Sequence, residues 1–150
     1  MLFWEDLEVG ERYDLGTTEV TREEVIDFAT RYDPQPFHLS DEAAALTHFG
    51  RISASGWHTC AMVMRVIVDS FTERQLASVG SPGVDNLRWL KPVFPGDTLS
   101  VTSETLETTP SRSKSGLGSA RSRIEATNQD GVKVLSMDTI LLVLRRPSAD

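Results

Sequence analysis

Residues 54–71 read ASGWHTCAMVMRVIVDSF and form the most apolar long segment of the chain. Apolar side chains occur on nearly all sides of this segment when it is drawn as a helix, and Arg65 and Asp69 lie four residues apart on one face. At about 1.5 Å per residue the helix would be roughly 25 Å long. Because a helix that is apolar all round is usually buried, we expect this one to lie inside the protein.

The chain after residue 83 changes to the pattern of β-strands. Four segments are rich in Val, Thr, Leu and Ile with partial alternation, namely residues 84–91, 98–108, 119–128 and 132–144. Pro95-Gly96-Asp97 predicts a turn between the first two, and Asn128-Gln129-Asp130-Gly131 predicts a hairpin between the last two. Two short stretches rich in Gly, Pro and Ser, residues 78–83 and 110–118, are predicted to be loops.

The chain before the long helix contains shorter elements. Residues 12–20 have the composition of an extended segment. Thr21 and Glu24 have the spacing of a capping box, and the helix that they begin should end near Tyr32, because an Asp-Pro pair follows. Ser40 is expected to cap a second, short helix.

Together these elements predict one α+β domain over residues 1–150, in which an antiparallel sheet is wrapped around a central helix. A length of 150 residues, with 39% hydrophobic and 25% charged side chains, is ordinary for one soluble domain. The last strand is apolar on both faces near residues 140–144, as expected at the centre of the sheet or at a dimer interface.

Charge and composition exclude several classes of protein. With 15 basic and 22 acidic residues the net charge is −7, which argues against a general nucleic-acid or membrane-surface binder. No segment has the length of a membrane span, and the acidic N-terminus lacks the features of a secretory signal, so a cytoplasmic location is expected. The single Cys60 rules out an internal disulfide, and the three histidines lack metal-ligand spacing, so no metal is predicted.

The segment Asp33-Pro34-Gln35-Pro36-Phe37-His38 could carry chemistry. Two prolines make it rigid, and they lie between a carboxylate and an imidazole. Such a pair, when it converges on one point, can hold a water molecule and remove its proton. The spacing alone also fits a structural loop in which Asp33 is a turn residue and His38 a hydrogen-bonded polar group.

A second candidate is Ser53-Ala54-Ser55-Gly56, at the predicted start of the long helix. The first N–H groups of a helix lack internal partners and lie at its positive end, and a glycine lets a ligand oxygen approach them. Gly56 could therefore hold a polarised carbonyl or an oxyanion, although Ser53 or Ser55 could equally be a simple N-cap and Gly56 a packing residue. The other candidates are interpreted as structural residues: His58 as a packed histidine, His48 as a surface loop residue and Cys60 as a small core residue.

A basic cluster lies in the second half of the chain. Arg112, Lys114, Arg121 and Arg123 have no acidic residue between them. The cluster is a candidate patch for an anionic ligand, because the chain as a whole is acidic. It also fits a solvated pair of strands.

These motifs, taken in order, resemble the MaoC-like dehydratase family, which includes the (R)-specific enoyl-CoA hydratases. The resemblance rests on Asp33-x-x-Pro36-x-His38, on Ala54-Ser55-Gly56, which ends eighteen residues after the histidine, and on residues 90–99, LKPVFPGDTL. It covers essentially the whole chain, from Leu7 to the last strand. It implies a hot-dog fold, and a homodimer or higher homo-oligomer whose sheets join edge to edge.

The resemblance also implies the chemistry. Members of the family hydrate trans-2-enoyl thioesters or dehydrate 3-hydroxyacyl thioesters, so the partner would be an acyl-CoA or acyl-carrier thioester, with no further cofactor. Asp33 and His38 would act on a water molecule, and the Gly56 N–H would bind the thioester carbonyl. The residues implied around the substrate are Gln35, Pro36, Phe37, Ser55 and Trp57, and the candidates for the CoA phosphates are Arg112, Lys114 and Arg121.

Three residues depart from the family pattern. Gln35 replaces the usual Asn, Ser55 replaces the usual His before the glycine, and Trp57 is bulkier than the usual residue and is expected to narrow the acyl pocket. Two alternatives stay open. A hot-dog thioesterase would commonly use an Asp or Glu on or near the central helix, and residues 56–68 contain neither. A non-catalytic acyl-CoA-binding module would keep the pocket without turnover.

Overall fold

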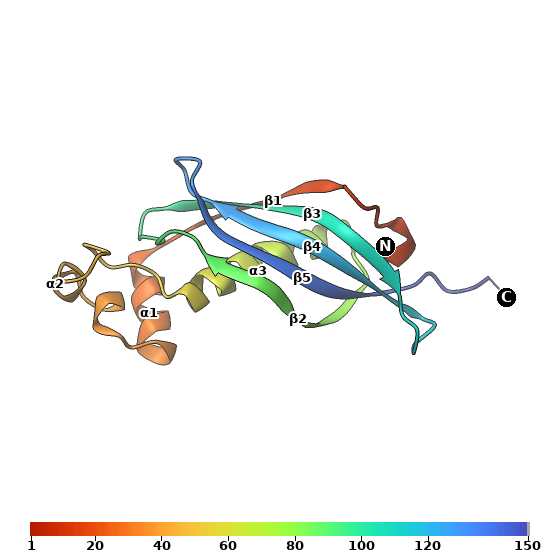
Figure 1. The fold of residues 1–150 in the computed structure, drawn as a ribbon, viewed down its shortest axis with the longest axis horizontal. Coiled ribbons are helices and arrows are strands. Elements are labelled where there is room, and N and C mark those ends of the chain that lie inside the picture. Colours follow the sequence, from red (N-terminus) through yellow and green to blue (C-terminus); the bar gives the residue numbers. More distant parts are fainter. Residues whose placement is uncertain (150) are drawn as a thin grey trace.

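A computed structural model, which describes residues 1–149, places the long helix α3 (Gly56–Arg74) along one face of an antiparallel sheet (Figure 1). In this part of the chain five strands lie in the order β1-β3-β4-β5-β2. Their bounds are Arg12–Glu19 for β1, Ser78–Trp89 for β2, Thr98–Pro110 for β3, Leu117–Thr127 for β4 and Lys133–Leu144 for β5. Every pairing between neighbours is antiparallel, which confirms the predicted α+β class.

Short helices lie at the two ends of the sheet. α1 (Arg22–Tyr32) and α2 (Asp41–Ala44) are at one end of the long axis, and η1 (Trp4–Asp6) is at the other (Figure 1). A second 3-10 helix, η2 (Pro36–His38), follows α1. The residues proposed to carry chemistry therefore lie at the end that bears α1 and α2.

The predicted N-caps of these helices are confirmed, but at Thr21 only one of the two hydrogen bonds of a capping box is present. The Thr21 hydroxyl accepts the Glu24 N–H at the start of α1, and the Ser40 hydroxyl accepts the Ala43 N–H at the start of α2. α1 ends at Tyr32, because the residue before a proline is disfavoured in the helical region.

The predicted turns and the central position of the last strand are confirmed as well. Asn128 N–H donates to the Val132 carbonyl across the hairpin between β4 and β5. In the turn before β3, the Asp97 carboxylate accepts the Phe94 N–H at 2.9 Å. β5 lies between β4 and β2, so both of its edges are paired.

The core lies between α3 and the inner face of the sheet. Val63 on α3 and Leu99, Val101 and Leu135 on the strands have no or almost no exposed surface. Leu99 and Val101 alternate with polar residues along β3, as expected for a strand with one buried face. Among the described residues, no helix is both long and apolar enough to cross a membrane.

The expectation that the long helix is buried all round is wrong for the single chain. Trp57, Met64 and Val68 are 60%, 49% and 41% exposed, and they share one face of α3. Arg65 and Asp69, which lie on one face as expected from their spacing, form an exposed ion pair at 3.0 Å. Exposed apolar side chains that gather on one helix face are typical of interaction sites.

The prediction of a loop at residues 78–83 is also wrong, because β2 already begins at Ser78. Its first half pairs with β5 through two irregularities in register, at Gly80 and at Gly83. Because β2 is an edge strand, Pro82 and the glycines interrupt no pairing on its free side.

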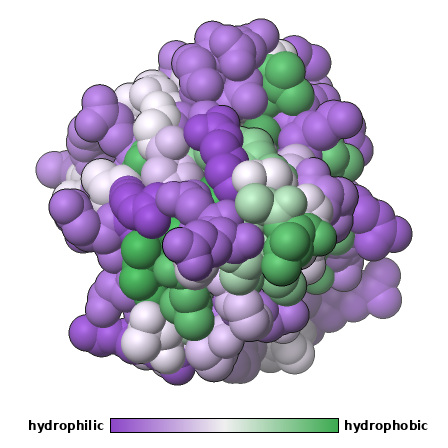
Figure 2. Space-filling model, turned by 90° about the vertical axis from the view of Figure 1, so that its left-hand side faces the viewer, coloured by the Kyte–Doolittle hydropathy of each residue, from purple (hydrophilic) through white to green (hydrophobic). Residues whose placement is uncertain are grey.

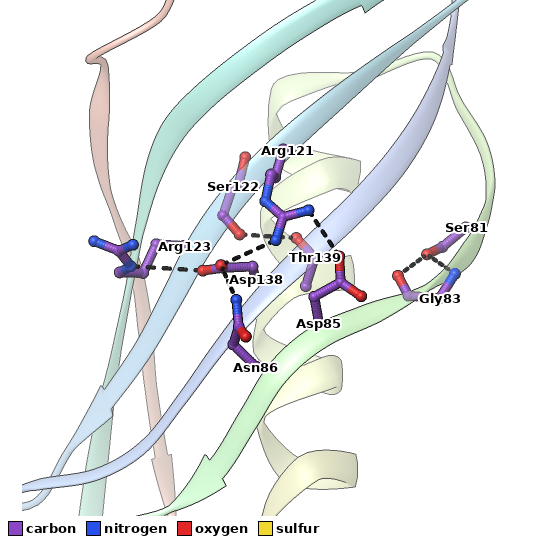
Figure 3. Close-up of polar contacts among 9 residues, drawn as sticks. All are labelled: Ser81, Gly83, Asp85, Asn86, Arg121, Ser122, Arg123, Asp138 and Thr139. Carbon is purple, nitrogen blue, oxygen red and sulfur yellow. Dashed lines mark hydrogen bonds and ion pairs between the residues drawn. The ribbon is translucent and has the colours of Figure 1, made fainter.

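Charged side chains form a network on the outer face of the sheet (Figure 3). Asp138 of β5 is 6% exposed and accepts hydrogen bonds from Asn86 at 2.9 Å and from Arg121 at 3.3 Å. Arg121 also donates to Asp85 at 2.7 Å, and Arg123 lies 3.5 Å from Asp138. Asn86 has a φ of 54°, at a point where β2 leaves regular register with β5. This bulge turns the Asn86 amide toward Asp138.

The network makes Asp138 a source of pH-dependent stability. Burial opposes ionisation of this carboxyl group, but the bonds from Asn86 and Arg121 and the charge of Arg123 hold its pKa below the usual 3.8. We expect Asp138→Asn to lower the free energy of unfolding by about 1–3 kcal/mol near neutral pH. The pKa of Asp138 is lower in the folded protein than in the unfolded chain. The stabilisation by its carboxylate is therefore complete at pH values above the unfolded-state pKa, and it is lost as the pH falls through the folded-state pKa.

Urea denaturation of both proteins at about pH 7 and about pH 3 checks this expectation. The difference between wild type and the variant should shrink at the lower pH. Asp85→Asn is the control. Asp85 is also a partner of Arg121, but its side chain is 50% exposed, so this change should lower the free energy of unfolding less than Asp138→Asn does. An Asp138→Asn penalty that is the same at both pH values would contradict the interpretation.

Candidate active site

The loop after α1 brings Asp33 and His38 together. The Asp33 N–H donates to the Ala29 carbonyl at 2.9 Å and closes the last turn of α1. Pro36 begins η2, and the His38 N–H donates to the Gln35 carbonyl at 2.9 Å. This tight turn points both side chains the same way, and His38 Nε2 lies 3.4 Å from Asp33 Oδ2. The two residues predicted to form a catalytic pair are therefore neighbours.

The imidazole of His38 is fixed in one orientation. Its Nδ1 lies 2.6 Å from the Ser53 carbonyl oxygen. Because a carbonyl oxygen only accepts hydrogen bonds, Nδ1 carries a proton, and in the neutral ring Nε2 is then free to take one. The ring is 6% exposed and packs edge-on against Phe37, with centroids 4.5 Å apart. His38 therefore presents a proton acceptor on the side of Asp33.

The surroundings of Asp33 keep it ionised. Burial raises the pKa of Asp33, but the hydrogen bond from the Gln35 amide, the nearby Ser55 hydroxyl and the positive charge that His38 carries when it is protonated outweigh burial and hold the pKa below its usual value. The Gln35 amide donates to Oδ1 at 2.7 Å. The Ser55 hydroxyl lowers the pKa of Asp33 by its proximity, because its oxygen atom has no hydrogen-bond partner among the described residues. Asp33 therefore carries a negative charge at neutral pH.

The start of α3 leaves polar atoms without partners. Ser55 occupies the N-cap position, but its side chain makes no capping hydrogen bond. The hydroxyl oxygens of Ser53 and Ser55 are buried and have no hydrogen-bond partner in the described part of the chain. The first N–H groups of the helix, beginning with Gly56, also lack partners inside the helix and lie at its positive end. This helix start is suited to a bound oxygen atom that carries negative charge.

A groove of about 470 Å³ borders both His38 and Gly56. Much of its wall is apolar, formed by Ala54, Leu90, Pro92, Val93 and Val134. Its volume is in the range of small-molecule sites. Asp33 does not line the groove and meets it through His38. Figure 2 shows the end of the molecule that bears α1 and α2, where hydrophobic side chains reach the surface only in separate patches among hydrophilic ones.

Trp89 forms one wall of this groove and packs on the start of α3. A Cβ atom at Gly56 would lie 2.5 Å from Cε2 of the Trp89 indole, so no other residue type fits under the ring without displacing it. Gly56 is therefore a packing residue, as well as the residue with the free N–H. The packing role of this glycine is confirmed, and its role in holding a carbonyl oxygen stays a prediction.

The other residues implied around the substrate have different positions. Gln35 binds Asp33, Pro36 begins η2, and Phe37 stacks on Phe49 at 5.4 Å, but none of these three lines the groove. Trp57 is 60% exposed and meets Trp89 edge-on at 5.1 Å, also outside the lining. Of these two tryptophans, Trp89 lines the groove and Trp57 does not, so the expectation that Trp57 narrows the pocket is not supported.

The residues named for the CoA phosphates lie away from the groove. Arg112 and Lys114 are in the connection between β3 and β4, at the end of the molecule opposite to α1 and α2 (Figure 1). Arg121 is occupied by Asp85 and Asp138 on the outer face of the sheet. A contact of this cluster with a ligand in the groove would have to come from a second copy of the chain.

Several residues of the groove are not singled out by the sequence. His48 is predicted to be a surface loop residue, and no signal assigns Trp89 to a site, yet both border the groove. Trp89 immediately precedes the motif at residues 90–99, and this neighbourhood could have indicated that Trp89 lies near the site. His58 is packed as predicted, stacked on Phe28 at 4.9 Å, and burial lowers its pKa. Within residues 1–149, no three His, Cys, Asp or Glu side chains are grouped to hold a metal ion.

Known proteins resemble the chain in sequence and in structure. The MaoC like domain family matches residues 6–127. An uncharacterized protein of Bacillus subtilis is 27% identical over 142 residues, covering 94% of this chain and 98% of that protein. A 3-hydroxybutyryl-CoA dehydratase of Methylorubrum extorquens is 30% identical over 153 residues, covering 100% of this chain and 89% of that protein.

A solved structure supports the same relation. The crystal structure of a MaoC-like dehydratase from Rhodospirillum rubrum is 39% identical, with a TM-score of 0.90, and the match covers 99% of this chain and 100% of that one. The hot-dog fold implied by the sequence resemblance is confirmed, because solved hot-dog structures share this sheet and helix. The family match extends over most of the chain and includes Asp33, His38 and Gly56, so the protein belongs to the MaoC-like hydratase and dehydratase family.

Proposed function

We propose that the protein hydrates trans-2-enoyl thioesters of the CoA type, or dehydrates the corresponding (R)-3-hydroxyacyl thioesters. The observation that carries the proposal is the pairing of Asp33 with His38, at 3.4 Å, beside a groove that also borders the free helix start at Gly56. His38 and Gly56 border the same groove, which supports a role of the first as proton acceptor and of the second as donor to an oxyanion. The dehydratase relative from Methylorubrum extorquens supports this reaction class.

The residues can divide the reaction as follows. The oxygen of a water molecule bonds to the β-carbon, and the π electrons move through the α-carbon to the thioester oxygen. His38 Nε2 takes a proton from the water, with the charge of Asp33 stabilising the imidazolium that forms. The Gly56 N–H and the positive end of α3 hold the enolate oxygen. His38 then returns the proton to the α-carbon, and the 3-hydroxyacyl thioester is complete.

Two other functions fit the site less well. A thioesterase needs a carboxylate placed to activate water for attack on the carbonyl carbon, and residues 56–68 of α3 supply none. A binding module would not need an ionised Asp33 beside an imidazole with a free nitrogen. These features favour the hydratase over both alternatives.

The assembly is part of the proposal. α3 exposes Trp57, Met64 and Val68. β2 is an edge strand, and its own residues Val79 and Val84 are exposed. Pairing of two copies would cover these apolar side chains and the free strand edge, which supports the predicted homodimer. The cytoplasmic location stays a prediction.

The proposal is tested by the absorbance of crotonyl-CoA at the conjugated enoyl-thioester band. We expect wild type to remove the band and to form (R)-3-hydroxybutyryl-CoA, which chiral chromatography separates from the (S) form. Release of free CoA thiol, followed with a thiol reagent, would instead indicate a thioesterase. Tight binding of crotonyl-CoA with no change in absorbance, and none with longer enoyl-CoAs, would indicate a binding module.

A further inference from the structure

We propose that Trp89 sets the length of the acyl chain, so that the groove accepts short chains and the indole blocks long ones. The inference rests on the proposed function, because it takes the ligand to be an acyl thioester with its carbonyl oxygen on the Gly56 N–H. Trp57, the residue expected from the sequence to narrow the acyl pocket, does not line the groove.

The first support is the contact between Trp89 and Gly56. Three atoms of the indole, Cε2, Cδ2 and Nε1, lie 2.5, 2.6 and 2.8 Å from the place of a Cβ on residue 56. The ring therefore rests directly on the Gly56 Cα. A thioester oxygen bound to the N–H of the same residue places the acyl group within reach of the indole.

The second support is the character of the groove around the indole. His38, which acts at the β-carbon, and Trp89 border the same space. Leu90, Val93 and Val134 continue the wall from Trp89, and they suit a hydrocarbon chain better than the polar amides of a pantetheine arm. The polar side chains of His48 and Lys91 border the same groove. A chain that extends past the β-carbon along this wall meets the indole.

The third support is that the indole is held in place by its neighbours. Trp89 is the last residue of β2 and pairs with Leu135, and the next residue, Leu90, donates its N–H to the Val134 carbonyl at 2.8 Å. Trp57 meets the indole edge-on. The ring is nevertheless 46% exposed, so its removal would enlarge the open groove instead of leaving a closed cavity.

The experiment compares short and long acyl groups in wild type, Trp89→Ala and Trp89→Phe. Butyryl-CoA and octanoyl-CoA are saturated and cannot be hydrated, so calorimetric titration gives their dissociation constants without turnover. Hydration of crotonyl-CoA and of trans-2-octenoyl-CoA gives the corresponding ratio of kcat/KM. We expect wild type to favour the short chain, Trp89→Ala to shift both ratios toward the long chain by at least about tenfold, and Trp89→Phe to shift them less.

Trp4→Ala is the matched control. The Trp4 indole also rests on a glycine, Gly118, and donates to the Ser119 carbonyl, but it lies at the far end of the molecule. We expect this variant to lose stability and to keep the wild-type chain-length ratios. Circular dichroism verifies that each variant is folded, and Trp89→Phe carries the test if Trp89→Ala does not fold.

The outcomes separate the two proposals. If wild type hydrates crotonyl-CoA and the Trp89 variants change both chain lengths equally, the role of Trp89 is overturned and the hydratase stands. If no enoyl-CoA is hydrated but the Trp89 variants shift the binding ratio, the hydratase fails and the role of Trp89 stands. If no acyl-CoA binds at all, both are overturned.

Discussion

His38→Ala is expected to lower kcat for hydration of an enoyl thioester by roughly 10²–10⁴-fold, and Asp33→Asn by a similar factor. Alanine removes the group that we propose takes the water proton, since Nδ1 of His38 is held by the Ser53 carbonyl and leaves Nε2 free in the neutral ring. Asparagine removes the negative charge that stabilises the imidazolium, 3.4 Å away, and keeps the volume of the side chain. The initial rate with crotonyl-CoA as substrate measures both effects.

The kinetic pattern distinguishes a catalytic role from a binding role. A group that acts only in the transition state lowers kcat and leaves KM nearly unchanged, whereas a loss of ground-state binding raises KM. Asp27→Asn is the control, because Asp27 is exposed on α1 and pairs only with Arg31 on the same helix. Full activity of both site variants, with Asp27→Asn as reference, would remove Asp33 and His38 from the mechanism.

The elements that could be predicted from the sequence are those with local causes. The caps at Thr21 and Ser40 act over three residues, and the Asp-Pro pair after Tyr32 ends α1 without help from the rest of the fold. The hairpin at residues 128–131 is equally local. Asp33 and His38 could be paired because one short turn separates them.

The features that could not be predicted depend on contacts between distant parts of the chain. Residues 78–83 look like a loop because Gly and Pro weaken a strand, but β5 supplies a pairing partner along that edge. Arg121 looks free because its acidic partners, Asp85 and Asp138, come from two other strands. The exposed face of α3 looks like part of the core in the sequence, because its residues are apolar. An apolar pattern alone does not say whether the same chain covers that face. The same limitation hid the packing of Trp89 on Gly56.

Gly56→Ala is expected to lower kcat/KM by on the order of 10²-fold, although it keeps the backbone N–H that would bind the thioester oxygen. The new methyl group would lie 2.5 Å from Cε2 of Trp89, so the indole or the start of α3 must move. A displacement near 1 Å at a reacting centre is enough for a loss of this size. The crowding should also lower the free energy of unfolding by about 1–3 kcal/mol.

The double variant Gly56→Ala with Trp89→Ala identifies the cause of this loss. If the clash with the indole is responsible, removal of the ring should restore much of the kcat/KM toward crotonyl-CoA, and the effects of the two changes will not add. Gly118→Ala is the control, because its methyl group would meet the Trp4 indole at the far end of the molecule. It should lower the melting temperature and leave kcat/KM of the folded protein unchanged. Additive losses in the double variant would mean that Gly56 is needed at the site for a reason other than its contact with Trp89, such as the direct approach of the thioester oxygen to the helix start.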